Sequence, residues 1–187
     1  GVGLEGIALS EIAYQTAVAF CRDRRQGRSL NTERNDASAE ADNILVHPDV
    51  RRQLLNVRAS TEGMRALAIW IGIQIDLAHN HPDAEARAHA NGLVELLTPV
   101  IKAYCTDRGF ENVSEALQVT GGSGYTTDWC IEQYLRDARI AMIYEGTNHI
   151  QALDLIGRKL PKDGGALYRA FSKEVYKFAK AQDGVYG

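Results

Sequence analysis

The residues "HPDVRRQLLNVRASTEGMRALAIWIGIQIDLAHNHPD", at positions 47–83, carry the pattern that decides the fold. Apolar or small side chains recur there in alternating steps of four and three, at Val50, Leu54, Val57, Thr61, Met64, Ala68, Ile71, Ile75 and Ala78. Such spacing places one continuous seam along a helix. Pro48 suits the first helical turn, and "HNHPD" ends the pattern. The stretch therefore predicts one helix of about 30 residues, roughly 45 Å long at about 1.5 Å per residue.

The segments on either side show the same helical period. Before the long helix, one apolar stripe predicts a helix that ends near Gly27; it consists of Leu9, Ile12, Ala13, Thr16, Ala17 and Phe20. After it, a further helix is predicted from Ala86, Ala90, Leu93, Leu97, Ile101 and Tyr104. Pro99 lies inside this helix and is expected to bend it. Residues 29–43 are polar and without period, which predicts a loop.

The last third of the chain is predicted to contain shorter helices. "NVSEAL" favours a separate short helix after "TDRGF", and "TGGSGYTTD" a glycine-rich turn. A helix follows from Trp129, and another after Glu145, capped by Thr147 or Asn148 and ended by Pro161. No stretch alternates with a period of two. The predicted fold class is all-α, an antiparallel four-helix bundle with additional short helices.

Composition excludes several classes of protein. The 187 residues are 45% hydrophobic and carry a net charge of −3 with acids and bases interspersed, so we expect no nucleic-acid partner. The longest apolar window, "LAIWIGIQIDLA", is interrupted by Gln74 and Asp76 and is too short to span a bilayer, so we expect no membrane partner. The three cysteines form no CxxC pair, which favours reduced thiols and a cytoplasmic location. The opening "GVGLEG" begins in a helical pattern without methionine, so we interpret the chain as part of a longer protein.

Three other motifs have an ordinary explanation beside a functional one. "GGSGY" is either a helix–helix turn or a ligand loop whose backbone N–H groups approach an anion. "RDRRQGR" either clamps a phosphate through Arg24 or Arg28 or forms a solvated helix end. His79, His81 and His89 are interpreted as surface residues, so no metal site is predicted.

Glu145 is the strongest candidate for chemistry. It follows the uncharged run "IAMIY" and precedes Gly146, which would let a ligand pass close to the backbone. Apolar surroundings favour the protonated form of a carboxyl group, which suits a general base working near neutral pH. The alternative is a carboxylate that stabilises the start of the next helix. The residues alone leave these two interpretations open.

Four stretches in order resemble the C-terminal helical domain of the acyl-CoA dehydrogenase family: "RRQGR", "ALQVTGGSGY", "RDARI" and "IYEGTNHIQ". The resemblance covers about residues 4–160. "HPDVRR", "LLTPVIKAY" and "IQALDLIGRKL" are similar to the larger subgroup that includes methylthiopropanoyl-CoA dehydrogenases. The resemblance implies a bundle domain at residues 1–162, followed by a helical tail at residues 163–187 that begins a C-terminal extension.

The resemblance implies an FAD-dependent oxidoreductase of fatty acid metabolism. Glu145 matches the base that removes the pro-R α-proton of an acyl-CoA thioester, while FAD accepts the β-hydride. Tyr144 and Gly146 match substrate-binding positions. The cofactor-binding positions are Arg24, Gln26, Gln118, Gly121, Gly122, Thr147, Asn148 and His149. The first five of these would contact the FAD of a neighbouring subunit, and the last three the subunit's own FAD.

Partners are also implied by the resemblance. An acyl-CoA substrate, electron-transfer flavoprotein as the electron acceptor, and a homodimer or homotetramer are expected. "RRQGR" lacks the usual phenylalanine between Gln26 and Gly27, which removes a stacking contact near the flavin. Without the other domains, this chain alone is expected to be inactive. The alternative functions are an acyl-CoA oxidase and a related flavoprotein helical module with a nucleic-acid-linked binding role.

Overall fold

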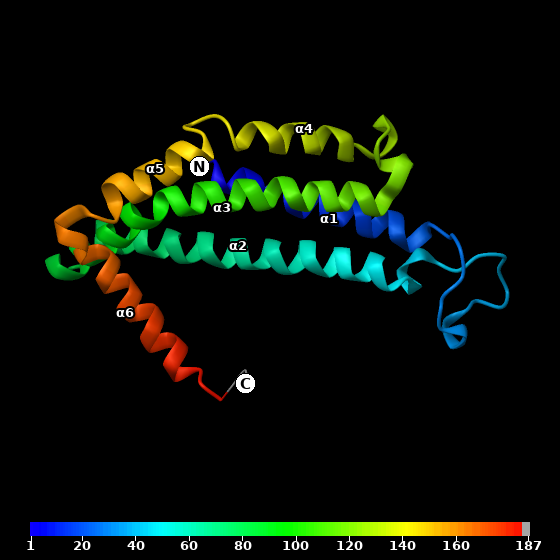
Figure 1. Cartoon of the computed structure of the whole chain (residues 1–187), viewed down its shortest axis with the longest axis horizontal. Coiled ribbons are helices and arrows are strands. Elements are labelled where there is room, and N and C mark those ends of the chain that lie inside the picture. The colour runs from blue at the N-terminus through cyan, green and yellow to red at the C-terminus, as the bar shows by residue number, and fades with distance from the viewer. Residues whose placement is uncertain (185–187) are drawn as a thin grey trace. The chain divides into compact units, whose positions relative to one another are not determined.

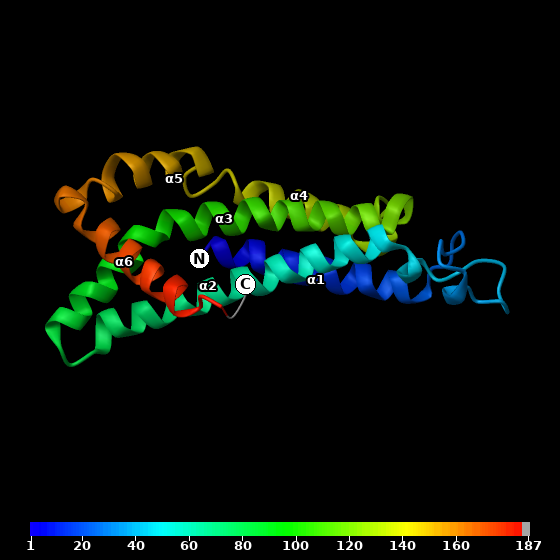
Figure 2. The same cartoon turned by 60° about the horizontal axis from the view of Figure 1, so that its bottom comes forward.

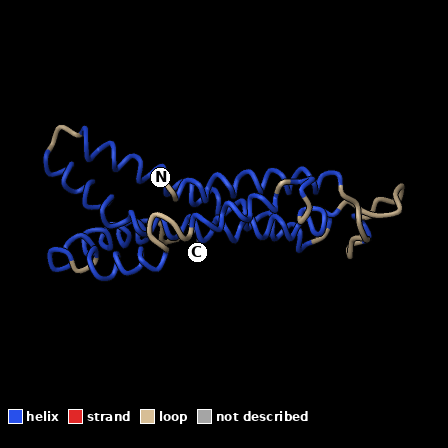
Figure 3. The backbone as a smooth tube through the Cα atoms, turned by 90° about the horizontal axis from the view of Figure 1, so that it is seen from above, coloured by secondary structure: helices blue, strands red, loops and turns tan. Residues whose placement is uncertain are grey.

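The computed structural model describes residues 1–184, and their regular structure is helical (Figure 3). The α-helices are α1 (Gly3–Asp23), α2 (Pro48–Asn80), α3 (Ala84–Gly124), α4 (Ile131–Ala141), α5 (Asn148–Asp154) and α6 (Ala166–Ala181). Short 3₁₀ turns lie at Thr32–Arg34, Ile44–Val46, Thr127–Trp129 and Lys162–Gly165, and a π-helical turn lies at Leu155–Lys159. Within residues 1–184, extended pairing is limited to one isolated antiparallel bridge between Arg25 and Asn43.

The chain divides into two compact units. The first consists of Gly1–Ala66 and Tyr104–Glu145, and the second of Leu67–Ala103 and Gly146–Gly187. In the first unit, α1, the start of α2, the end of α3 and α4 lie alongside one another as a four-helix bundle (Figure 1). The all-α bundle that the helical periods predict is therefore confirmed.

Small side chains on α1 and α3 form the centre of the first unit. Its buried core residues are Ala13, Ala17, Phe20, Cys21, Ile44, Leu54, Val113, Ala116, Val119, Ile131 and Ala138. The aromatic rings of Phe20 and Trp129 meet edge to face, with centroids 5.1 Å apart. Where α1 crosses α3, a Cβ atom added to Gly6 would lie 2.0 Å from the carbonyl oxygen of Cys105. Glycine at this position therefore permits the close approach of the two helices.

A buried polar group also joins three helices of this unit. The side chain of Asn112, on α3, accepts a hydrogen bond from Ser60 Oγ on α2 at 2.8 Å and donates one to Ser10 Oγ on α1 at 3.1 Å. Asn112 is 5% exposed, so its amide depends on these protein partners. The network fixes the register of the three helices, because a shift would leave a buried amide without its partners.

The second unit has its own small core. Ile71, Leu96 and Leu97 are buried together, with Leu155, Leu160 and Phe171 packed against them. On the surface of this unit, Glu95 accepts hydrogen bonds from Lys159 at 3.2 Å and from Lys162 at 2.7 Å. The predicted tail is helical where it is described, as α6, and its last residues, 185–187, lie outside the described part of the chain.

Two predicted helix ends were wrong. The helix α1 ends at Asp23 rather than near Gly27, because the chain turns to extended backbone at Arg24. The segments around "TDRGF" and "NVSEAL" belong to one continuous helix, α3, and Pro99 lies inside it. Side chains on both sides of "TDRGF" are buried, and this packing outweighs the glycine at position 109.

The polar loop between α1 and α2 has an internal anchor and extends beyond the ends of both helices (Figure 2). The buried carboxylate of Asp42 accepts hydrogen bonds from the backbone N–H groups of Ser29 at 2.7 Å and Asp36 at 2.6 Å. Arg28 Nη1 lies 3.1 Å from the same carboxylate. These donors hold the pKa of Asp42 below its usual range, the backbone N–H of Asp36 having the largest effect.

Candidate functional site

The five residues predicted to contact a neighbouring subunit's FAD line one cavity. Arg24, Gln26, Gln118, Gly121 and Gly122 surround a volume of about 460 Å³ in the first unit. Three segments create it: the end of α1 with the chain that leaves it, the residues around the start of α2, and the last turns of α3. Because α1 ends at Asp23, the "RRQGR" residues lie in extended chain beside the end of α3.

The glycines keep this cavity open. Gly121 has φ +58 and ψ −146, a conformation that favours glycine and interrupts the helical geometry of α3. A Cβ atom added to Gly121 or Gly122 would meet no atom of the chain within 4 Å, so a side chain there would project into open space. Backbone at this wall can therefore be approached closely by a ligand.

Two further residues of the cavity were missed from the sequence. His47 lines it, and its Nε2 lies 2.8 Å from the carbonyl oxygen of Gln26. The aromatic ring of Phe20 also lines it, from the last turns of α1. The cavity thus has a phenylalanine, although none stands between Gln26 and Gly27. His47 comes directly before Pro48, the first residue of α2. The predicted start of this helix was the signal in the sequence that could have placed His47 next to the loop between α1 and α2.

Glu145 lies in the turn after α4, where the backbone takes two left-handed residues in succession. Its φ is +56 and that of Gly146 is +82. A left-handed conformation is uncommon for a residue with a side chain, and such residues cluster at functional sites. The carboxylate of Glu145 is exposed in this structure. Tyr144, the preceding residue, donates a hydrogen bond from its hydroxyl to the carboxylate of Glu5 on α1.

The residues after Glu145 begin α5 and are fixed by their own contacts. Thr147 is the N-cap residue, and its hydroxyl accepts a hydrogen bond from the backbone N–H of Ile150 at 3.3 Å. The predicted cap is therefore confirmed at Thr147. The side chain of Asn148 accepts a hydrogen bond from Lys102 Nζ at 2.7 Å, and His149 is exposed in the first turn of α5.

The last turns of α3, which line the cavity, come before α4 in the chain, and Glu145 comes after it. The cavity is formed where α3 ends and leads toward α4, and Glu145 follows the last turn of α4. This helix has 11 residues, which corresponds to about 16 Å at about 1.5 Å per residue. The predicted site residues are thus brought together as two separate groups rather than one.

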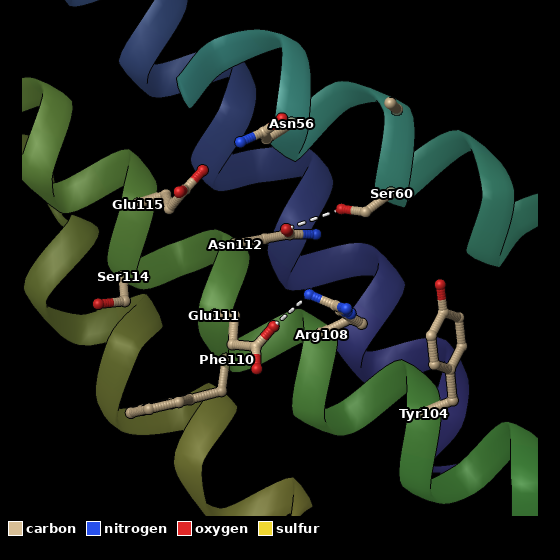
Figure 4. Close-up of a pocket in the computed structure, with 10 residues that line it drawn as sticks. Asn56, Ser60, Tyr104, Arg108, Phe110, Glu111, Asn112, Ser114 and Glu115 are labelled. Atoms are coloured by element: carbon tan, nitrogen blue, oxygen red, sulfur yellow. Dashed lines mark hydrogen bonds and ion pairs between the residues drawn. The ribbon is translucent and has the colours of Figure 1, made fainter. Parts of the chain in front are cut away.

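A larger cavity of the first unit, of about 680 Å³, contains none of the predicted site residues (Figure 4). Its polar side chains bind one another: Ser60 donates to Asn112 at 2.8 Å, and Arg108 pairs with Glu111 at 2.7 Å. These contacts join Ser60 of α2 to α3 and pair two residues within α3, as expected for the packing of helices.

No group of three or more histidine, cysteine, aspartate or glutamate side chains among residues 1–184 is placed to hold a metal ion. None of the helices in the same range is both long and apolar enough to cross a bilayer.

Comparison with known proteins decides the family. The family model described as "Acyl-CoA dehydrogenase, C-terminal domain" matches residues 1–160. The chain belongs to the acyl-CoA dehydrogenase family. The resemblance carried by the four sequence stretches is therefore confirmed.

Relatives of this acyl-CoA dehydrogenase domain agree with the subgroup that the sequence resembles. A 3-methylmercaptopropionyl-CoA dehydrogenase of Ruegeria pomeroyi is 47% identical over 174 residues, which cover 93% of this chain and 29% of the relative. The broad-specificity linear acyl-CoA dehydrogenase FadE5 of Mycobacterium tuberculosis is 36% identical, over 98% of this chain and 30% of the relative. The domain thus spans about three tenths of the length of these relatives.

Solved structures show the same fold. Butyryl-CoA dehydrogenase from Megasphaera elsdenii matches with a TM-score of 0.62 and 22% identity, over 86% of this chain and 35% of that one. Caenorhabditis elegans ACDH-11, solved in complex with C11-CoA, matches with a TM-score of 0.69 and 21% identity, over 94% and 28% of the two chains. The helical bundle of this acyl-CoA dehydrogenase domain is therefore shared with complete enzymes.

Proposed function

We propose that the chain is the C-terminal helical domain of an FAD-dependent acyl-CoA dehydrogenase, with Glu145 as the base that removes the α-proton of an acyl-CoA thioester. The observation that carries this proposal is the turn at Glu145 and Gly146. It holds an exposed glutamate in an uncommon backbone conformation, beside a glycine that also has a positive φ. When bound, FAD supplies the acceptor for the hydride that leaves the β-carbon.

Substrate binding would change the surroundings of Glu145. Its carboxylate is exposed in this chain, and a thioester lying against it would exclude water from one side. A carboxylate without its hydration is a stronger base. Gly146 and Tyr144, the two residues next to Glu145 in the chain, are proposed to line the thioester and the acyl group.

The cavity at the end of α3 fits part of an FAD molecule. Arg24 supplies a guanidinium, and the backbone at Gly121 and Gly122 is open to a ligand. Thr147, Asn148 and His149 are proposed to contact a second FAD near Glu145. The family resemblance assigns the two groups to different FAD molecules, and a homodimer or homotetramer is therefore proposed for the whole protein. Electron-transfer flavoprotein is proposed as the acceptor, and the cytoplasm as the location.

The test is anaerobic titration of the full-length protein with a panel of acyl-CoA thioesters, following the absorbance of oxidised flavin. The wild type should be bleached by at least one thioester. Glu145→Gln should retain FAD but lose flavin reduction by roughly 10²- to 10⁴-fold, as expected for removal of a general base. Glu132→Gln, which changes an acid on α4, is the matched control and should keep the wild-type rate.

Two outcomes would count against the proposal. A Glu145→Gln protein that reduces its flavin at the wild-type rate would show that another group is the base. A wild type that holds FAD but is bleached by no thioester would favour a role outside acyl-CoA oxidation. Release of peroxide in air, in place of transfer to electron-transfer flavoprotein, would identify an oxidase.

A further inference from the structure

A buried lysine is bonded to the turn that carries Glu145. Lys102, on α3, is 7% exposed. Its Nζ atom donates hydrogen bonds to the carbonyl oxygen of Gly146 at 2.9 Å and to Asn148 Oδ1 at 2.7 Å. The side-chain amide of Asn148 in turn lies 3.4 Å from the carbonyl oxygen of Ala103. Lys102 and Ala103, which are consecutive residues of α3, are thus hydrogen-bonded to Gly146 and Asn148, on the C-terminal side of Glu145.

Burying the ammonium group of Lys102 costs free energy, so its position requires an explanation. An ammonium group loses hydration on burial, and its four-carbon stem loses rotamer freedom. Both costs must be offset by well-placed acceptors. Lys159 and Lys162 of the same unit pair instead with a carboxylate, that of the partly exposed Glu95. Lys102 differs because one of its acceptors is the backbone of the residue directly after Glu145.

The backbone conformation at Glu145 and Gly146 requires restraint by the surrounding residues. Glu145 and Gly146 both have positive φ values, and glycine offers many alternative conformations. A rotation about the bonds of Gly146 would redirect the chain on one side of Glu145. Gln151 Nε2 also lies 3.4 Å from the Gly146 carbonyl, a longer contact than that of Lys102. The shorter, charge-assisted bond from Lys102 is therefore the stronger of the two restraints.

We propose that Lys102 is a positioning residue for the proposed base: it fixes the Gly146 carbonyl and Asn148, and through them the direction of the Glu145 carboxylate. This inference rests on the proposed function of Glu145. Lys102 is bonded to the backbone of Gly146 and to the side chain of Asn148, so the effect proposed for it is on geometry. A misplacement of about 1 Å in a reacting group can lower a rate by on the order of 10²-fold.

The experiment uses the full-length enzyme with FAD bound and the acyl-CoA thioester that reduces the wild-type flavin fastest. Lys102→Met keeps the length of the stem and removes the ammonium group. We expect the rate constant of flavin reduction at saturating thioester to fall about 10- to 100-fold, with the half-saturating concentration changed less than about threefold. Lys102→Arg, which keeps a donor of larger shape, should recover part of the rate.

A matched control separates positioning from general stability. Lys159→Met also removes an ammonium group with a bonded carboxylate partner in the same unit, away from Glu145. It should leave the rate constant unchanged, even if the melting temperature falls. Hydrogen exchange of the peptide at residues 142–149 should be faster in Lys102→Met than in Lys159→Met, because only the former loses the bond to Gly146.

Either of two results would overturn the inference. One is a Lys102→Met enzyme with the wild-type rate per bound FAD. The other is unchanged exchange at residues 142–149. If Lys102→Met does not fold, Lys102→Gln, which removes the charge and shortens the side chain, provides the same test, and a wild-type rate per bound FAD in it would overturn the positioning role. Glu145→Gln tests the proposed function separately from the role of Lys102. If Glu145→Gln loses flavin reduction but Lys102→Met does not, Glu145 is still the base and the positioning role of Lys102 is wrong.

Discussion

The hydroxyl group of Tyr144 donates a hydrogen bond to the carboxylate of Glu5, so the residue before the proposed base is bonded to α1. The sequence predicts Tyr144 only as a wall of the acyl pocket. The structure adds a contact that fixes its ring. A carboxylate acceptor stabilises the neutral phenol, and this hydrogen bond raises the pKa of Tyr144.

The first prediction concerns the titration of that phenol. A raised pKa means that the contact stabilises the fold below the ordinary tyrosine pKa of about 10 and is lost as pH rises through the higher folded value. The tyrosinate absorbance that Tyr144→Phe removes from the wild-type spectrum should therefore appear above pH 10. In a Glu5→Gln background, the same difference should appear at lower pH than with Glu5 present. An identical titration in both backgrounds would show that Glu5 does not hold the hydroxyl.

The second prediction concerns the crossing of α1 and α3. Gly6→Ala places a methyl group 2.0 Å from the carbonyl oxygen of Cys105, and backbone cannot move aside as a side chain can. We expect the free energy of unfolding to fall by about 1–3 kcal/mol, the usual cost of overpacking, or more. Gly63→Ala is the control: an added Cβ there meets no atom within 4 Å, so helix propensity should raise stability by about 0.5–1 kcal/mol. Chemical denaturation of both variants measures the difference, and equal effects would refute the close crossing.

The third prediction concerns the loop between α1 and α2. Its anchor, Asp42, has a lowered pKa, so the carboxylate stabilises the loop above the ordinary aspartate range and loses this effect as pH falls through its folded value. Asp42→Asn should speed hydrogen exchange at the amides of Ser29 and Asp36 by roughly tenfold at neutral pH, as expected for the loss of charge-assisted bonds. Glu33→Gln, which changes an exposed acid of the same loop, should leave both amides unchanged.

The effect of Asp42→Asn on hydrogen exchange should depend on pH in a direction that follows from the lowered pKa of Asp42. The ratio of exchange rates between Asp42→Asn and wild type should shrink toward one as pH is lowered below about 4, because the wild-type carboxylate then becomes protonated. A ratio that stays constant across this range would show that the carboxylate charge does not anchor the loop.

The helices of this protein were predictable because their apolar periods are long and uninterrupted. The seam from Val50 to Ala78 is strictly periodic, and α2 follows it from Pro48 to Asn80. The break expected at "TDRGF" was wrong because local propensity at Gly109 competes with tertiary packing of buried neighbours such as Cys105 and Val113. Such packing cannot be evaluated from one segment alone.

Only those residues of the candidate site that match a family motif could be predicted from the sequence. Arg24 and Gln118 are found through the family pattern, and the structure places them at one cavity. His47 and Lys102 stand in stretches similar to the larger subgroup, but neither was predicted as a site residue, and each is hydrogen-bonded to the backbone of a residue 21 or 44 positions away. Nothing in the sequence pairs a side chain with a distant carbonyl group, so contacts of this kind come only from the fold.

The last prediction separates backbone strain from cavity shape at the end of α3. Gly121→Ala forces a side chain into φ +58 and ψ −146, which should lower the free energy of unfolding by about 1–3 kcal/mol. Gly122→Ala carries no such conformation and lies in helix with open space around the added methyl group, so its stability should be unchanged or slightly raised. Both methyl groups project into the cavity of Arg24 and Gln118, so in the full-length protein both should weaken FAD retention, Gly122→Ala by about tenfold, a change of about 1.4 kcal/mol. Flavin released during gel filtration measures retention, and chemical denaturation measures stability. If Gly122→Ala keeps its FAD as tightly as the wild type, the cavity is not a cofactor site, whatever Gly121→Ala does to the fold.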